Sequence, residues 1–139
     1  MWQRAILALC LGVALAVGEA HAQAVMYQLD ASMNNVVALN HIFLNDQGCT
    51  AGGQVVGRIT KREFGSSGIV PSRFVLERMS GERMFINVPE ISIDTMSRVD
   101  IAWVVRGLQT FLREGQSVVA GVKLCGNAPI MMLDSLKPR

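Results

Sequence analysis

The sequence has few of the residues that most catalytic sites need. Its 139 residues include only two histidines and three cysteines, and no C-x-x-C pair occurs. The motifs G-x-S-x-G and H-E-x-x-H, a P-loop and a dinucleotide fingerprint are also missing. These absences leave no motif that indicates a hydrolase, a metalloprotease, a thiol redox enzyme or a nucleotide-binding protein, and no cofactor or metal site is expected.

Long apolar runs are missing as well. The longest, Ala5–Val17, has 13 residues, fewer than the roughly 20 that a membrane-spanning helix needs. It follows the basic residue Arg4 and precedes Ala20-His21-Ala22, a small-residue cleavage pattern. This order predicts a signal peptide over residues 1–22, with cleavage before Gln23 or two residues later. The protein is therefore expected to be periplasmic or secreted, with no membrane span after cleavage.

Charge gives little information, because a net charge of +2 indicates no particular partner. Cysteine content gives more. Cys10 lies in the predicted signal peptide, so Cys49 and Cys125 are the cysteines left in the exported chain. In an oxidising compartment two cysteines predict one intramolecular disulfide. A disulfide between Cys49 and Cys125 would close a loop of about 75 residues, and closing a loop of this length stabilises a fold by about 4 kcal/mol in the chain-entropy model.

The segment after the signal peptide predicts a helix. Between Ser32 and Gly48, apolar residues recur every three or four positions at Met33, Val36, Leu39 and Phe43. Residues 23–50 are therefore predicted to be an N-terminal helical extension, although Ile42-Phe43-Leu44 also fits a strand.

The remainder, residues 51–139, predicts one domain of short strands with a single helix. Two of the predicted strands form a hairpin around Ser80-Gly81-Glu82. The predicted helix begins at Ser97, with the spacing of a capping box, and ends at Gly115. The predicted strands are Gly53–Lys61, Arg73–Met79, Arg83–Val88, Gln116–Cys125 and Ile130–Leu133, the last extending toward Leu136.

This order of elements resembles the OB-fold, a five-stranded Greek-key barrel with a helix between strands three and four. The resemblance covers residues 51–136 and depends on element order and glycine placement. It implies an α+β, mainly β fold in which the first and fourth strands pair, bringing Cys49 beside Cys125. A β-sandwich or an open α+β sheet would also allow that pairing.

The candidate binding residues are basic and aromatic side chains on the first three strands of that domain. OB-folds bind oligonucleotides or oligosaccharides on this face, where cations contact the ligand backbone and aromatic rings stack. A solvated barrel rim, with charges that deter aggregation, also explains such residues. The set comprises Arg58, Lys61, Arg62, Phe64, Arg73, Arg83 and Phe85.

No catalytic residue is predicted. His41 is a lone histidine among apolar residues, which is more typical of a structural or surface side chain. We therefore expect a small exported binding domain that contacts an envelope protein or an anionic ligand, rather than nucleic acid, through its basic face. The alternatives are a degenerate nuclease-like or other hydrolase, and a subunit of an envelope complex.

Overall fold

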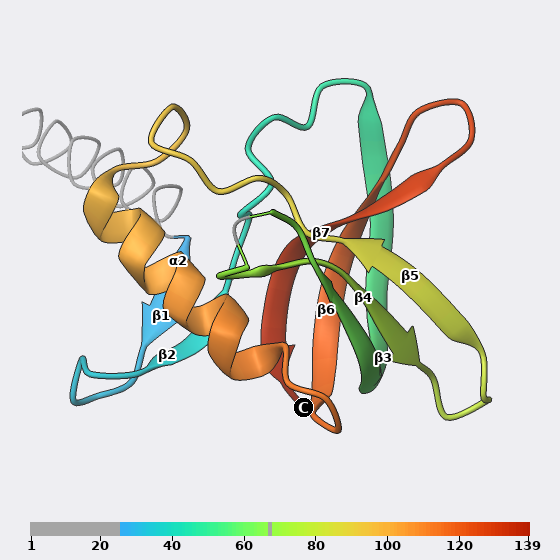
Figure 1. Cartoon of the computed structure of the whole chain (residues 1–139), viewed down its shortest axis with the longest axis horizontal. Helices are drawn as coiled ribbons and strands as arrows, with labels where there is room; N and C mark the ends of the chain where they lie inside the picture. Colours follow the sequence, from blue (N-terminus) through green and yellow to red (C-terminus); the bar gives the residue numbers. More distant parts are fainter. Residues whose placement is uncertain (1–25, 67) are drawn as a thin grey trace, which may run out of the picture.

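A computed structural model describes residues 26–66 and 68–139 (Figure 1). The predicted signal peptide lies outside these residues. The described chain contains seven strands and one α-helix. They are β1 (Tyr27–Leu29), β2 (Val36–Leu39), β3 (Cys49–Phe64), β4 (Pro71–Glu77), β5 (Arg83–Asn87), α2 (Arg98–Phe111), β6 (Ser117–Cys125) and β7 (Ile130–Pro138).

All seven strands belong to one mixed sheet in the order β1-β2-β7-β5-β4-β3-β6, with a further pairing between β7 and β6. The pairings therefore run from β3 through β4, β5, β7 and β6 back to β3. Only β5 and β7 pair in parallel, through Asn87 and Met132. At its other end β7 pairs with β2 through Leu136 and Leu39, and this contact adds the β1–β2 hairpin to the sheet.

The prediction of a five-stranded OB-like barrel with an N-terminal helix is wrong. The structure has a seven-stranded mixed sheet, and strands β1 and β2 occupy the segment that was predicted to be helical. Val36, Leu39 and Ile42 from this segment are buried in the same core as the rest of the described chain. The segment is thus an integral part of the fold.

Two features explain why this segment is not a helix. Met33 and His41 have φ angles of 59° and 46°, a left-handed conformation that interrupts a right-handed helix. The turn between β1 and β2 is organised by Asp30, whose carboxylate accepts hydrogen bonds from the Ser32 hydroxyl and from the backbone and side chain of Asn35. These bonds lower the pKa of Asp30 to about 2.

The predictions for the later elements fare better. The hairpin forms between β4 and β5 with Glu77 opposite Arg83. The helix begins at Ser97, whose hydroxyl accepts a hydrogen bond from the backbone N–H of Asp100 at 3.2 Å. Both features depend on short stretches of sequence, which is why local patterns are sufficient to identify them.

One core lies between α2 and the sheet. The helix buries Val104, Leu108 and Phe111, and these pack with Phe74 and Ile86 from the hairpin strands. Gly107 brings the helix close to β2, since a β-carbon there would lie 2.8 Å from the Leu39 side chain. Among the described residues, no helix has both the length and the apolar character needed to cross a membrane.

Strand β3 pairs with two different neighbours along its length. Residues 49–58 pair with β6 and residues 58–64 pair with β4, so the strand changes direction near Gly57 (Figure 1). A β-carbon on Gly57 would contact the Leu76 side chain and lie 2.5 Å from the Glu77 carbonyl oxygen. The absence of a side chain at Gly57 therefore lets β4 cross close to β3.

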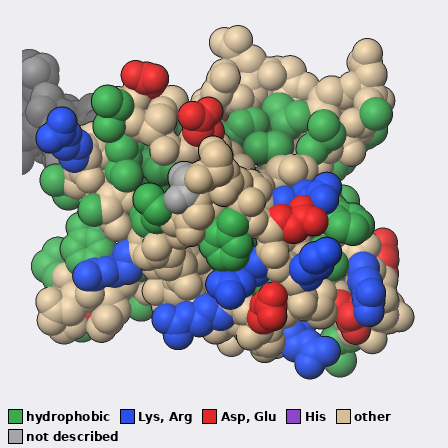
Figure 2. All heavy atoms as spheres, viewed as in Figure 1, with side chains coloured by type: hydrophobic (Ala, Val, Ile, Leu, Met, Phe, Trp, Pro, Cys, Tyr) green, Lys and Arg blue, Asp and Glu red, His purple; other side chains and the backbone are tan. Residues whose placement is uncertain are grey.

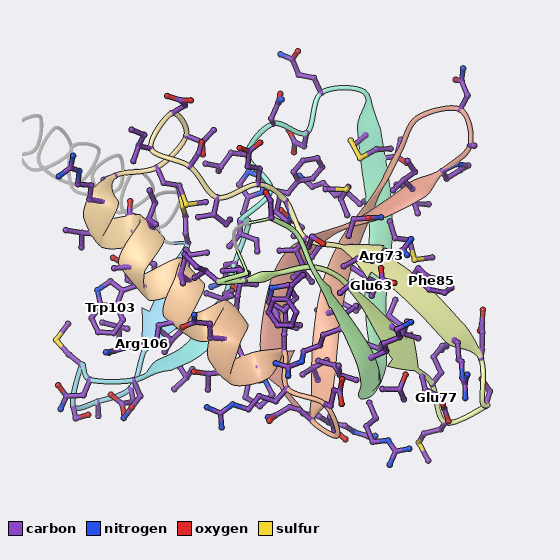
Figure 3. The ribbon with its side chains drawn as sticks, viewed as in Figure 1. Glu63, Arg73, Glu77, Phe85, Trp103 and Arg106 are labelled. Atoms are coloured by element: carbon purple, nitrogen blue, oxygen red, sulfur yellow. A yellow bond between two sulfur atoms is a disulfide. The ribbon has the colours of Figure 1, made fainter. Side chains whose placement is uncertain are left out.

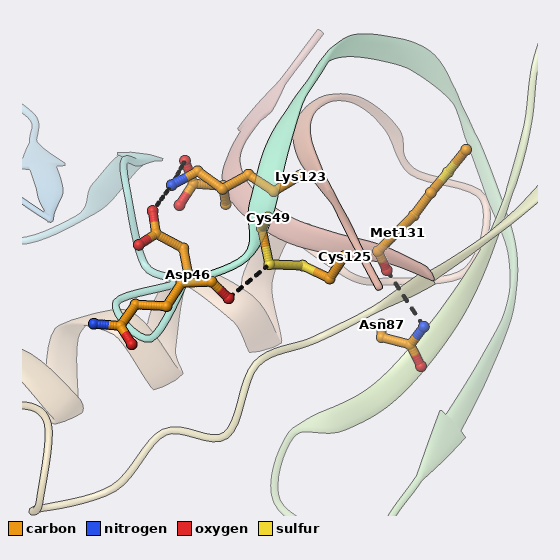
Figure 4. The surroundings of a disulfide bond; sticks show 8 residues. Asp46, Cys49, Asn87, Lys123, Cys125 and Met131 are labelled. Carbon is orange, nitrogen blue, oxygen red and sulfur yellow. Dashed lines mark hydrogen bonds and ion pairs between the residues drawn. A yellow bond between two sulfur atoms is a disulfide. The ribbon is translucent and has the colours of Figure 1, made fainter. Parts of the chain in front are cut away.

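The predicted disulfide is present. Cys49 and Cys125 lie directly opposite each other at the end of the β3–β6 pairing, with their α-carbons 4.3 Å apart (Figure 4). They are 76 residues apart in the sequence. The disulfide thus joins the start of β3 to the end of β6, the strand that follows α2.

We expect Gly57→Ala to lower the free energy of unfolding by about 1–3 kcal/mol or more, because the added methyl group overlaps backbone and core atoms. Gly65→Ala is the matched control, since its β-carbon would have no neighbour closer than 3.7 Å. Urea unfolding followed by circular dichroism measures both. If the two variants had the same urea midpoint of unfolding, the result would contradict the close approach of β4 to β3 at Gly57.

Replacing both cysteines, Cys49→Ser with Cys125→Ser, should lower the free energy of unfolding by up to about 4 kcal/mol, the loop-closure value for a cross-link of this span. Intact-mass measurement under non-reducing conditions should show the wild-type protein two hydrogens lighter than its reduced form. Two thiols that react with an alkylating agent in the native protein would contradict the disulfide.

Candidate functional site

The outer surface of β3, β4 and β5 carries most of the predicted binding residues, and we call it the strand face. The pairing register places Lys61 opposite Val75 and Val75 opposite Phe85. It also places Arg58 opposite Glu77, and Glu77 opposite Arg83. The strand face is thus formed by Arg58, Lys61, Glu63, Arg73, Val75, Glu77, Arg83 and Phe85.

An irregularity in β3 divides the predicted set. The register shifts between Ile59 and Lys61, so Thr60 is an extra residue in β3. Such a bulge reverses the alternation of side chains that follow it. As a result Lys61 shares a face with Arg58, whereas Arg62 pairs with Phe74 on the opposite, core-directed side.

Arg62 and Phe64 consequently contribute to a different part of the molecule. The Arg62 guanidinium lies 5.4 Å from the centre of the Phe64 ring and donates a hydrogen bond to the carbonyl of Leu112, the residue that caps α2. Cations are favourable at this end of a helix. Arg62 therefore stabilises the helix end instead of joining Arg58 and Lys61 in a binding surface.

Acidic partners neutralise much of the positive charge on the strand face. Glu63 lies opposite Arg73 and accepts a 2.5 Å hydrogen bond from its Nε, and Lys61 lies 3.9 Å from the same carboxylate. Glu77 pairs with Arg83 at 3.3 Å. Figure 2 shows acidic side chains interspersed among basic ones on this side of the molecule. The surface is therefore mixed in charge rather than uniformly basic.

The Glu63–Arg73 pair changes the pKa of both partners. The hydrogen bond from Arg73 is the main reason that the pKa of Glu63 lies below its usual value, and the charge of Lys61 contributes least. The same bond raises the pKa of Arg73. Both groups are therefore held in their charged forms across neutral pH.

Phe85 is the aromatic residue at the centre of this arrangement. Its side chain is 55% exposed, although it pairs across the sheet with the buried Val75. The Arg73 guanidinium lies 5.0 Å from the centre of the Phe85 ring, a cation–π geometry. In Figure 3 Arg73, Glu63 and Phe85 lie together, with Glu77 further along the same strands.

A second aromatic cluster, which the sequence analysis did not identify, lies on α2. Trp103 stacks on Tyr27 with ring centres 6.1 Å apart, and the Arg106 guanidinium lies 5.2 Å from the Trp103 ring. The Tyr27 hydroxyl donates a hydrogen bond to the Asp100 carboxylate at 3.1 Å. The pKa of Tyr27 is raised, mainly by burial and also by this hydrogen bond. These contacts hold β1 against the helix, which gives the cluster a structural role.

A third polar group surrounds the start of β3. Asp134 lies 3.1 Å from the His41 ring and accepts a backbone hydrogen bond from Phe43, while Lys123 forms ion pairs with Asp46 and Asp134 (Figure 4). These bonds fix the segment between β2 and β3 on strands β6 and β7. In residues 26–66 and 68–139, no three His, Cys, Asp or Glu side chains are grouped closely enough to hold a metal ion.

No family model matches the chain, and none of the curated proteins or solved structures with which it was compared is similar to it. These comparisons therefore do not test the resemblance to the OB-fold, whose expected five-stranded barrel with an N-terminal helix is replaced here by a seven-stranded sheet. Any function has to be argued from the side chains themselves.

We expect Arg73→Ala to raise the pKa of Glu63 toward the value of a free glutamate, because the variant loses both the hydrogen bond and the charge. Lys61→Ala should raise it much less. Carboxyl carbon shifts measured by NMR across a pH titration report both variants. In the wild type the pair adds stability above the ordinary pKa of glutamate, and that contribution is lost as the pH falls through the lowered pKa. If both variants changed the pKa of Glu63 by the same amount, the result would contradict the specific Glu63–Arg73 pair.

Proposed function

We propose that the chain is an exported binding domain that recognises a protein partner through the strand face. Export is supported by the charged, apolar and small-residue order of residues 1–22 and by the disulfide between Cys49 and Cys125, since structural disulfides persist in oxidising compartments. Both features lead us to place the partner outside the cytoplasm.

The observation that carries the proposal is the exposed Phe85 ring beneath the Arg73 guanidinium. Aromatic residues, phenylalanine included, and arginine are enriched in the buried cores of protein interfaces. Here Phe85 pairs with the buried Val75 within the sheet and its ring contacts the Arg73 guanidinium, which restricts the ring before binding. A preordered anchor loses little side-chain entropy when a partner covers it.

The mixed charge of the strand face favours a protein over a polyanion. Glu63 and Glu77 pair with Arg73 and Arg83, so a polyanion would have to displace both carboxylates or bind beside them. A protein surface with charges of both signs can complement these pairs without breaking them. We therefore place the binding energy on Phe85 and Arg73 and assign the surrounding ion pairs to specificity.

A photo-crosslinking amino acid in place of Phe85 tests the proposal in cells that produce the protein. We expect a discrete adduct with one partner protein, and we expect the adduct to weaken when Arg73→Ala is added. The same amino acid in place of Ile130, which is 53% exposed but lies outside the strand face, is the matched control and should give no such adduct.

Adducts of the same mass from both positions, or none from position 85, would refute the protein interface. A different pair of results would assign the strand face to an anionic ligand instead. In that case no adduct forms at position 85, and the purified protein binds heparin but loses this binding when it carries both Arg73→Ala and Arg83→Ala. Circular dichroism of each variant verifies that the fold is intact.

A further inference from the structure

A second surface lies at the turn of the β4–β5 hairpin, where it meets β3, β6 and β7. Register places Val56 opposite Val119 and Val119 opposite Lys137. In the next row Arg58 lies opposite Ser117, whose carbonyl accepts a hydrogen bond from the backbone N–H of Arg139. We call this area the tip surface; its side chains are those of Val56, Arg58, Arg78, Met79, Val119, Lys137 and Arg139, of which Arg58 also belongs to the strand face.

The tip surface has an apolar centre bordered by cations. A shallow hollow of about 370 Å³ is lined by Val56, Val119 and Met79 together with Arg78 and Arg139. Met79 is 88% exposed, the highest exposure among the large hydrophobic side chains of the described residues. One Arg139 guanidinium nitrogen lies 3.9 Å from the Met79 sulfur, so the apolar tip and a positive charge are adjacent.

Apart from the shared Arg58, the cations here differ from those of the strand face, because most of them have no acidic partner. Arg78 pairs with Glu82 at 3.3 Å. Within residues 26–66 and 68–139, Arg58, Lys137 and Arg139 form no ion pair with a carboxylate. The tip surface therefore carries three cations without a carboxylate partner and one paired cation, and Arg139 lies next to the exposed Met79.

From this arrangement we infer that the tip surface binds an anionic lipid bilayer. Lysine and arginine side chains are attracted to the negative potential of such a membrane. Apolar side chains next to them gain free energy when they enter the boundary between headgroups and acyl chains. Met79 is placed to enter that boundary while Arg78 and Arg139 contact lipid phosphates.

A bilayer fits this surface better than a soluble anion. The hollow is open to solvent rather than enclosed. An enclosed site would be needed to hold a small anion in water. A bilayer, by contrast, presents many phosphates at once and an apolar layer for Met79. The inference does not depend on the strand-face proposal, because the two surfaces use different anchors.

Sedimentation with lipid vesicles tests the inference. The purified protein should bind vesicles of phosphatidylglycerol and phosphatidylcholine in equal parts, bind vesicles of phosphatidylcholine alone much more weakly, and lose affinity as the salt concentration rises. Each basic residue near an anionic surface contributes about fivefold to the partition coefficient. Arg78→Gln with Arg139→Gln should therefore weaken binding about 25-fold.

Matched controls separate the tip surface from general charge and from the N-terminal residues. Arg98→Gln removes one charge from an exposed position on α2 and should leave the partition coefficient within about twofold of the wild type, whereas Arg139→Gln alone should weaken binding about fivefold. Met79→Ser should weaken binding severalfold, whereas Met33→Ser, at a residue that is 68% exposed, should not. Every variant has the same N-terminal residues, so any difference between variants reports on the substituted positions.

Three outcomes would overturn the inference. The first is no binding to the anionic vesicles, and the second is an equal loss of binding in the tip and control variants. The third is binding of monomeric dodecyl phosphate without binding to vesicles, which would identify a soluble amphiphile as the ligand. A strand-face adduct can still form in all three cases, so failure here is distinguishable from failure of the proposed function.

Discussion

The fold depends on one strand that serves two neighbours. Strand β3 pairs with β6 along its first part and with β4 along its second, and this is possible because Gly57 lets the Leu76 side chain and the Glu77 backbone come close. The disulfide fixes the start of the same strand to β6. Both surfaces include side chains of β3, so the bend in this strand contributes to the placement of both.

Local sequence patterns predicted the parts of the fold that local interactions determine. The β4–β5 hairpin and the Ser97 cap each depend on residues a few positions apart. The N-terminal segment was predicted wrongly because Val36 and Leu39 fit a helix by spacing, while their burial depends on β7, which is distant in the sequence. The Asp30 turn could have been suspected from the run of Asp, Ser and Asn residues that precedes Val36.

The candidate site shows the same division. The sequence located cations and an aromatic residue on β3, β4 and β5, but one bulge at Thr60 decides which of them share a face. It sends Arg62 to the end of α2 and keeps Lys61 with Arg58. Composition also could not show that Glu63 and Glu77 lie opposite arginines, because cross-strand register depends on the paired sheet.

The pairing of charges distinguishes the two surfaces in physical terms. Arg73 and Arg83 lie directly across the sheet from carboxylates, and opposite charges in that position stabilise strand pairing. Their presence therefore has a structural explanation, and the functional signal on the strand face is the exposed Phe85. Cross-strand carboxylate pairing does not explain Lys137 or Arg139, because Lys137 lies opposite Val119 and the Arg139 backbone binds Ser117. Arg139 lies next to the exposed Met79, and among residues 26–66 and 68–139 neither Lys137 nor Arg139 forms an ion pair with a carboxylate. The two surfaces therefore differ in whether their cations are already neutralised.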